Sequence, residues 1–236
     1  MLDFLLDAIP FKKALLVGTG GGNDICSTTL IAAYLQNKGI QVDIAGVNSP
    51  AARHTYDCVP EETINVVSSA KRFIPYRGGV EVRYIDNLLP SLCRQNGLKV
   101  EVFNFSFLFG TDRLIADLNQ FVKNRKYDIV IAVDVGGDIL ARGKEDPTIL
   151  SPLMDFSTLH VLSQLDVPTA LVEFGLQTDQ ELRPVGCAEI LSDLFRCNIL
   201  QAADTIKKSD PEVSIFRSIF DEVKKSSSWE HSANVF

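Results

Sequence analysis

The residues best suited to chemistry lie in three short segments that combine glycine with aspartate. Residues 18–24 read GTGGGND, residues 134–138 read DVGGD, and residues 175–179 read GLQTD. Each segment directly follows an apolar, strand-like run. Because the carboxyl ends of parallel strands meet at one edge of a sheet, we expect the three segments to line a single pocket.

The first segment has the pattern of an anion-binding loop. Gly20, Gly21 and Gly22 lack the Cβ that would keep a ligand away from the backbone, and Asn23 and Asp24 lead into a helical pattern. Backbone N–H groups at the start of a helix bind anions, most often phosphate. We therefore predict that this loop holds the anionic part of a small-molecule ligand.

The second segment carries the residues that we predict to be catalytic. Asp134 ends a run of buried residue types, where a charged carboxylate needs a partner to offset its lost hydration. Asp134 and Asp138 are our candidates for an acid and base pair, or for ligands of a divalent cation such as Mg²⁺. The alternatives left open are that Asp138 caps a helix and that Asp134 only braces the glycine turn.

Four further residues complete the predicted pocket. Gly136 and Gly137 lie beside these aspartates, and Glu145 and Asp179 are expected at the rim. Established nucleotide motifs do not fit, since Asn23 stands where a dinucleotide fingerprint needs glycine. The sequence also lacks the Gly-Lys-Ser/Thr of a Walker loop and the GxSxG of a nucleophile elbow.

Strand-like and helical patterns alternate along the chain, and this order must position the three segments. Strands are predicted over residues 14–17, 41–47, 80–85, 98–103, 128–133 and 169–174. Helices are predicted over residues 25–37, 88–96, 112–123, 158–165, 184–206 and 211–225. The unbroken apolar run at 128–133 is typical of an inner strand that is covered on both faces.

Such alternation predicts an α/β fold, with a single doubly wound, mainly parallel sheet and helices on both faces, as in Rossmann-like proteins. We expect one domain over residues 1–225, with a long polar insertion at about 51–79 and a loosely ordered tail at 226–236.

Composition narrows the class of protein and of partner. The net charge of −7 over 236 residues argues against a nucleic-acid-binding face, and the longest apolar runs are too short to span a bilayer. Five scattered cysteines without CxxC spacing indicate reduced thiols, and the acidic amino-terminal segment is a poor signal peptide. We expect a cytoplasmic protein with a small-molecule ligand, and leave open a homo-oligomer.

With these segments in view, the chain resembles the domain-of-unknown-function family 1152. The resemblance rests on GTGGGND, VDVGGDILARGKED, LSPLMD and, more loosely, FGLQTDQEL, and extends over about residues 13–205. It implies a Rossmann-like α/β fold without a settled activity. The positions that it singles out are Gly20, Gly21, Gly22, Asp24, Asp134, Gly136, Gly137, Asp138, Gly143, Glu145, Ser151, Pro152 and Asp155.

Two departures from the family pattern affect the expected activity. Gln180 follows Asp179 where similar proteins have glycine, and the chain is expected to stop short of a final strand region. The leading hypothesis is an enzyme that transfers or hydrolyses a group on a phosphate-containing metabolite or nucleotide. The alternatives are a non-catalytic nucleotide or sugar-phosphate sensor, and a structural protein whose pocket has decayed.

Overall fold

The computed structural model describes residues 3–20, 24–48, 62–67, 76–77, 80–81, 85–143, 146, 149, 152–178 and 180–226. The strands are β1 (Lys13–Gly18), β2 (Gln41–Asn48), β3 (Ile64–Val66), β4 (Tyr76–Arg77), β5 (Val80–Glu81), β6 (Val102–Ser106), β7 (Ile129–Val135) and β8 (Thr169–Phe174). The helices are α1 (Asp3–Ala8), α2 (Asp24–Asn37), α3 (Ile85–Gln95), α4 (Thr111–Arg125), α5 (Pro152–Ser163), α6 (Pro184–Arg196) and α7 (Pro211–Ser226), with short 3₁₀ turns η2 (Phe107–Phe109) and η3 (Asp138–Leu140).

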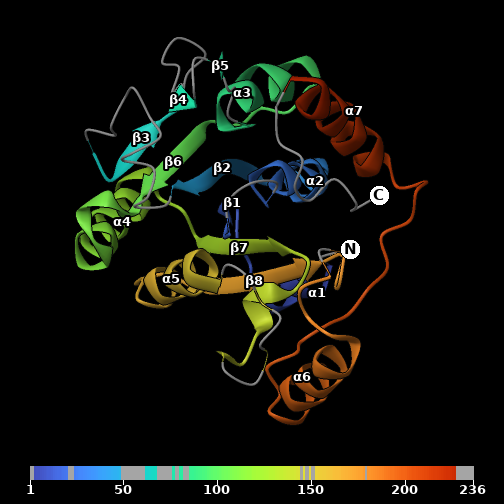
Figure 1. Ribbon diagram of the computed structural model, residues 1–236. Helices are drawn as coiled ribbons and strands as arrows, with labels where there is room; N and C mark the ends of the chain where they lie inside the picture. Colours follow the sequence, from blue (N-terminus) through green and yellow to red (C-terminus); the bar gives the residue numbers. More distant parts are fainter. Residues whose placement is uncertain are drawn as a thin grey trace.

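Six strands form one sheet in the order β3-β6-β2-β1-β7-β8 (Figure 1). All neighbouring pairs are parallel except β3 with β6, while β4 and β5 form a separate antiparallel pair. β1 and β7 lie inside the sheet, and every residue of β7 except Val135 is buried. The prediction of a mainly parallel α/β sheet is confirmed.

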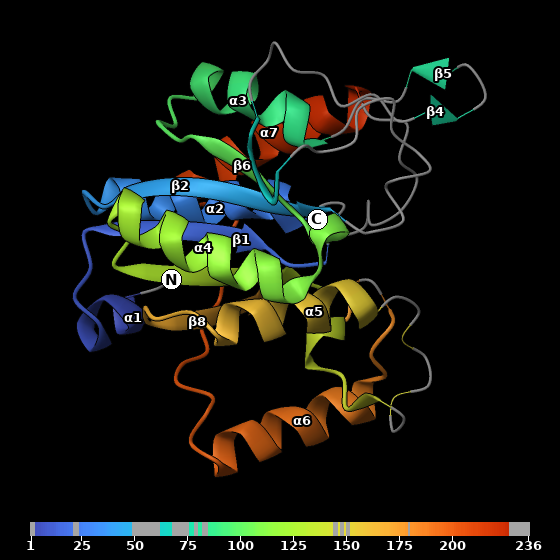
Figure 2. The ribbon, with the colours of Figure 1, turned by 90° about the vertical axis from the view of Figure 1, so that its left-hand side faces the viewer.

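Helices cover both faces of this sheet because side chains along each strand alternate between them. Leu16 of β1 belongs to the core beneath α2, α3 and α7, whereas Leu15 belongs to the core beneath α4 and α5. Figure 2 shows α4 and α5 in front of the sheet and α2 and α7 behind it. The paired apolar faces are typical of a doubly wound fold.

The helix α2 follows β1 and is enclosed almost completely. Residues from Asp24 to Leu35 are all buried, because α2 packs against β1, β2 and β7 on one side and α7 on the other. Apolar and small side chains therefore occupy all sides of α2, as expected for a helix in a large core. This burial fixes Asp24, its first residue, at the carboxyl end of β1.

Several element boundaries differ from those predicted. The helix predicted over residues 184–206 ends at Arg196, where Cys197 and Asn198 turn the chain, and residues 199–207 form neither helix nor strand. The strand predicted over 98–103 begins at Val102, and the helix predicted over 158–165 begins at Pro152. Of the strand predicted over 80–85, the structure describes Val80–Glu81, and Ile85 already belongs to α3. None of the described helices is long and apolar enough to cross a membrane.

Candidate functional site

The three glycine–aspartate segments follow β1, β7 and β8, which are parallel neighbours in the sheet. The segments therefore lie at the same edge, where the Thr19 N–H donates to the Val133 carbonyl at 3.2 Å. The Gln177 N–H likewise donates to the Gly136 carbonyl at 2.6 Å. The helix α2, which follows β1, covers one face of the sheet, and the helix α5, which follows β7, covers the other. The carboxyl ends of β1 and β7 are therefore the place at which ligands bind in open α/β sheets.

Asp134 is the penultimate residue of β7 and its side chain is only 1% exposed. The Thr19 hydroxyl donates to its Oδ1 at 3.2 Å, and the Gly137 N–H donates to its Oδ2 at 3.3 Å. Gly136 and Gly137 have φ angles of 121° and 103°, which favour glycine. The glycine turn therefore folds back over the Asp134 carboxylate.

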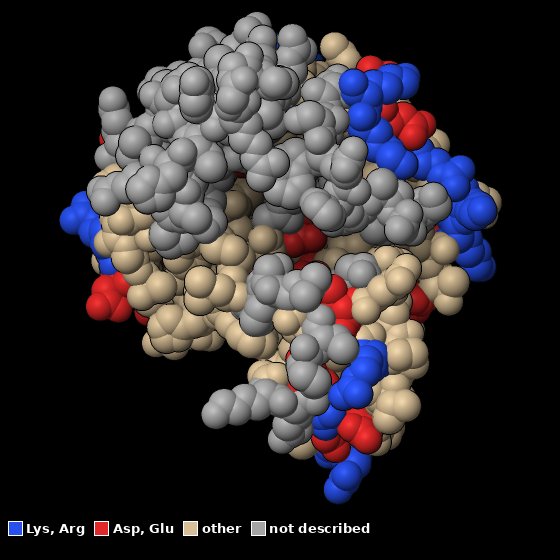
Figure 3. Space-filling view, in the orientation of Figure 1, with Lys and Arg blue, Asp and Glu red and all other residues tan. Residues whose placement is uncertain are grey.

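Two further buried aspartates meet Asp134. Asp24 is the first residue of α2, and Asp155 lies in the first turn of α5. One carboxylate oxygen from each of the three aspartates lies within 4.8 Å of the other two. The Oδ1 atom of Asp155 is buried and has no hydrogen-bond partner within the described chain. Figure 3 shows acidic side chains in a hollow near the middle of this face.

Gly20 allows the carboxylates of Asp24 and Asp155 to approach the backbone. The Gly20 N–H donates to Asp24 Oδ2 at 2.7 Å. A Cβ on Gly20 would lie 2.5 Å from Asp155 Oδ1 and 2.8 Å from Asp24 Oδ2, closer than van der Waals contact permits. Of the four residues 20–23 that we predicted to hold an anion, Gly20 thus lies directly against the aspartates.

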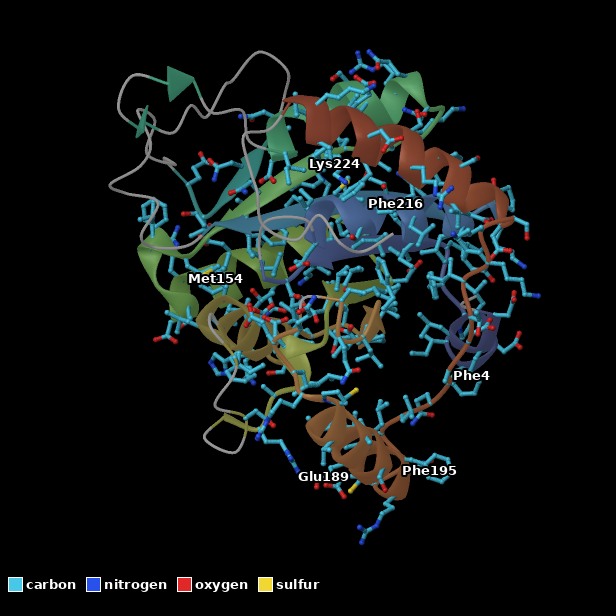
Figure 4. All side chains as sticks on the ribbon, turned by 45° about the vertical axis from the view of Figure 1, so that its right-hand side comes forward. Phe4, Met154, Glu189, Phe195, Phe216 and Lys224 are labelled. Carbon is cyan, nitrogen blue, oxygen red and sulfur yellow. The ribbon has the colours of Figure 1, made fainter. Side chains whose placement is uncertain are left out.

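Helix α5 is tied to the same loop by a side-chain hydrogen bond. The Thr158 hydroxyl lies 2.9 Å from the Thr19 carbonyl, one turn along α5 from Asp155. Figure 4 shows oxygen-tipped side chains gathered between the sheet and the part of α5 where Met154 is labelled. The position of Asp155 therefore depends on the contact between α5 and the loop after β1.

Burial and mutual repulsion raise the pKa values of these acids. Burial, followed by the charges of Asp134 and Asp155, holds the pKa of Asp24 well above its usual range, although the Gly20 N–H opposes the shift. Burial, followed by the charges of Asp138 and Asp134, raises the pKa of Asp155 to about 8. Any cation or proton that neutralises these carboxylates therefore stabilises the site.

A fourth acid, Glu173, lies beside Asp134 on the neighbouring strand. The two residues are paired in register, so their side chains project from the same face of the sheet. Burial and the neighbouring carboxyls of Asp134, Asp24 and Asp138 raise the pKa of Glu173 to about 12. Neither Glu173 oxygen has a donor among the described residues, so a hydrogen bond to Asp134 requires a proton on one of the two carboxyls.

The structure brings together some of the predicted site residues and leaves others apart. Gly20, Asp24, Asp134, Gly136 and Gly137 lie together at this edge. Asp138 is not one of the three aspartates whose oxygens converge, although its charge raises the pKa values of Asp24, Asp155 and Glu173. The predicted residues outside the described part of the chain are Gly21, Gly22, Asn23, Glu145 and Asp179.

Comparison with known proteins identifies the family. The family model described as "Protein of unknown function (DUF1152)" matches residues 15–230, which include all of the six-stranded sheet except the first two residues of β1, and also the three segments at its edge. The chain belongs to this family. Asp24, Asp134 and Asp155 all lie inside the matched region.

Other comparisons add little about activity. No curated protein matches the chain. One similar solved structure is N,N'-diacetylchitobiose deacetylase from Pyrococcus horikoshii in complex with its inhibitor MPG, with 12% sequence identity and a TM-score of 0.33. The match covers 93% of this chain and 82% of that chain. At this TM-score, the likeness carries no conclusion about what the chain does.

Two members of the acidic group, Asp155 and Glu173, were not predicted from their local sequence. Asp155 was singled out by the family resemblance but not by its local pattern, because it lies on a helix that is predicted too short. Glu173 was not considered, although it shares a feature with Asp134: each is an acid at the penultimate position of an apolar strand. An acid at that place in two successive strands was the available signal.

Proposed function

We propose that the chain is an enzyme that binds a divalent cation through Asp24, Asp134 and Asp155 and transfers or hydrolyses a group on a phosphate-containing small molecule. The observation that carries the proposal is the convergence of three buried carboxylates from three separate elements. One oxygen among them, Asp155 Oδ1, has no hydrogen-bond partner among the described residues.

The spacing of these oxygens suits a hard cation. Oxygens that share one Mg²⁺ at about 2.1 Å are at most about 4.2 Å apart, and those around Ca²⁺ at about 2.4 Å reach about 4.8 Å. The observed separations are all within 4.8 Å, which is the limit for oxygens that share one Ca²⁺. A cation would also remove the repulsion that raises the pKa values of Asp24 and Asp155.

The phosphate part of the proposal rests on the surroundings of the acids. A bound divalent cation polarises phosphoryl oxygens and neutralises their charge. The loop after β1 carries Gly20 against the acids, and α2 and α5 both begin at the site, where helix amino termini favour anions. In this proposal, Asp138 stays near enough to act as acid or base, and Glu173 supports Asp134 from β8.

Metal binding tests the first half of the proposal. Free Mn²⁺ is followed by electron paramagnetic resonance during titration of the wild-type chain and of Asp155→Asn. We expect wild-type binding and at least a tenfold loss of affinity in Asp155→Asn, since an amide keeps the shape of the ligand but removes its charge. Absence of Mn²⁺, Mg²⁺ and Ca²⁺ binding at millimolar concentration would refute the cation site.

Asp43→Asn is the matched control for this titration. Asp43 is another buried aspartate of the same sheet, near the amino end of β2, where the Tyr127 hydroxyl donates to it at 2.7 Å and the Glu101 N–H at 2.9 Å. Its loss should lower the stability of the fold without changing the affinity for Mn²⁺. Equal losses of affinity in both variants would indicate a general effect on folding.

Ligand screening tests the second half. The melting temperature is measured with nucleotides and sugar phosphates, each with and without Mg²⁺, because a ligand of the native state raises stability. We expect a phosphate compound to raise it only with Mg²⁺, and Asp134→Asn to abolish turnover of that compound with little loss of stability. Binding without turnover in the wild type would support a sensor, and no stabilisation by any phosphate compound would contradict this substrate class.

A further inference from the structure

We propose that the outer face of α6 is a dimerisation surface and that its partner is a second copy of the same chain. This surface, here called the α6 face, consists of Val185, Glu189, Ser192, Phe195 and Arg196. In Figures 1 and 2, α6 lies apart from the sheet at the lower end of the molecule. The inference is independent of the proposed cation site.

Apolar exposure is concentrated on this helix and just after it. Among the described residues, three of the four most exposed large apolar side chains are Phe195, Val185 and Ile199, at 73%, 71% and 63%. The apolar side chains on the opposite side of α6 are buried, because Cys187 and Ile190 pack with Leu182 in a small core. Figure 4 shows Phe195 and Glu189 projecting outward from α6.

The charges on the α6 face, together with the neighbouring Arg142 and Asp193, favour a second copy over a strongly charged partner. Glu189 and Asp193 are matched by Arg142, which donates to Glu189 Oε2 at 2.9 Å, and by Arg196, whose Nη1 lies 3.5 Å from Asp193 Oδ1. These four residues carry no net charge, although the whole chain carries −7. Figure 3 shows basic and acidic atoms intermingled over this end of the molecule. A neutral face of alternating sign can therefore approach its own copy without the repulsion that the rest of an acidic chain would cause.

Two-fold symmetry converts this pattern into complementary contacts. A two-fold dimer places the same patch on both sides, so a residue near one end of the helix meets one near the other end. Antiparallel α6 helices crossing beside Ser192 would set Glu189 of each copy against Arg196 of the other. The same arrangement sets Val185 against the exposed Ile199 that follows α6, and so removes both apolar side chains from water.

The test is the mass of the full chain in solution, measured by light scattering after size exclusion and by sedimentation velocity across a concentration series. We expect a species of twice the 26.0 kDa chain mass. Phe195→Ser and Val185→Ser should each raise the dimer dissociation constant at least tenfold. Val66→Ser is the matched control, because Val66 is 53% exposed on β3, at the opposite edge of the sheet from β8.

Charge reversal tests the pairing itself. Arg196→Glu should weaken the dimer at least tenfold, and addition of Glu189→Arg to that variant should restore much of the affinity. All these side chains are exposed, so each variant should melt within a few degrees of the wild type in its monomeric form. A wild-type chain that remains monomeric at about 100 μM, or a dimer that Phe195→Ser and Arg196→Glu leave unchanged, would overturn the proposal.

Discussion

At the scale of single residues, Gly20 allows the backbone to lie directly against the carboxylates of the site. Its N–H holds Asp24, and the space that a side chain would fill is occupied by the carboxylates of Asp24 and Asp155. This requirement differs from the usual reason for glycine in a turn, which is a positive φ angle. The glycine is needed here because two carboxylates approach the main chain closely.

We therefore expect Gly20→Ala to disturb the aspartates directly. The added methyl group would force Asp155 or Asp24 to move, which should lower Mn²⁺ affinity at least tenfold and cost about 1–3 kcal/mol of stability. Calorimetric titration and chemical denaturation measure the two effects. Gly39→Ala is the control: Gly39 has φ 79° and no neighbour within 4 Å of its Cβ position, so it should lose about 1 kcal/mol without a change in affinity. Unchanged Mn²⁺ binding in Gly20→Ala would contradict this description of the site.

At the scale of elements, the site depends on how α2 and α5 are held against strands from opposite faces of the sheet. Asp24 begins α2 on one face, and Asp155 lies in the first turn of α5 on the other. Their carboxylates meet only at the strand edge between β1 and β7. The Thr158 hydroxyl, which lies 2.9 Å from the Thr19 carbonyl and 2.8 Å from the Met154 carbonyl, is one side-chain link between α5 and this loop.

Thr158→Val should loosen this link while keeping the shape of the side chain. Loss of the hydrogen bond to the buried Thr19 carbonyl should cost about 1–2 kcal/mol and lower Mn²⁺ affinity, because Asp155 would no longer be fixed against the loop. Thr29→Val is the control, since the Thr29 hydroxyl donates to the Cys26 carbonyl within α2. Denaturant unfolding and Mn²⁺ titration should show a loss of stability in both variants and a loss of affinity only in Thr158→Val. Equal Mn²⁺ affinity in the two variants would show that α5 is positioned by other contacts.

At the scale of the whole molecule, the acidic group should make stability depend on pH in an unusual direction. The folded pKa of Asp155 is about 8, against an ordinary value of 3.8, and the pKa values of Asp24 and Glu173 are raised too. Between the ordinary pKa of 3.8 and the folded pKa of about 8, Asp155 in the folded state binds more protons than in the unfolded state. The contribution of these groups to stability is therefore present at low pH and is lost as the pH rises towards 8.

A cation should reverse this loss, because it binds the ionised carboxylates and competes with protons. We expect the rise in melting temperature on adding Mg²⁺ to be larger at pH 8 than at pH 5. Calorimetric scans with and without Mg²⁺ across this range measure the difference, and Asp155→Asn should reduce it. A rise that is the same at both pH values would show that Mg²⁺ stabilises the protein elsewhere.

Much of the architecture could be predicted from local patterns. The apolar run at 128–133 predicted an inner strand, and β7 (Ile129–Val135) is one, because an unbroken apolar run is stable only when both faces are covered. The glycines at 18, 136 and 175 marked the strand ends, and β1, β7 and β8 end there in a shared orientation. Helix ends were predicted less well: α6 stops ten residues before position 206, because Asn198 adopts a φ angle of 57° and turns the chain out of the helix.

What the sequence determined by itself was the presence of Asp24 and Asp134 beside the carboxyl ends of β1 and β7. Only the tertiary structure decided which acids share a site. Asp155 reaches Asp24 because the first turn of α5 lies at this edge of the sheet, and Glu173 reaches Asp134 because β8 pairs with β7 in that register. The contact between Asp155 and Asp24 has no local signal, since a carboxylate separated by many residues of chain gains its neighbours only when strand order and helix packing are fixed. The burial that shifts the pKa values has the same origin.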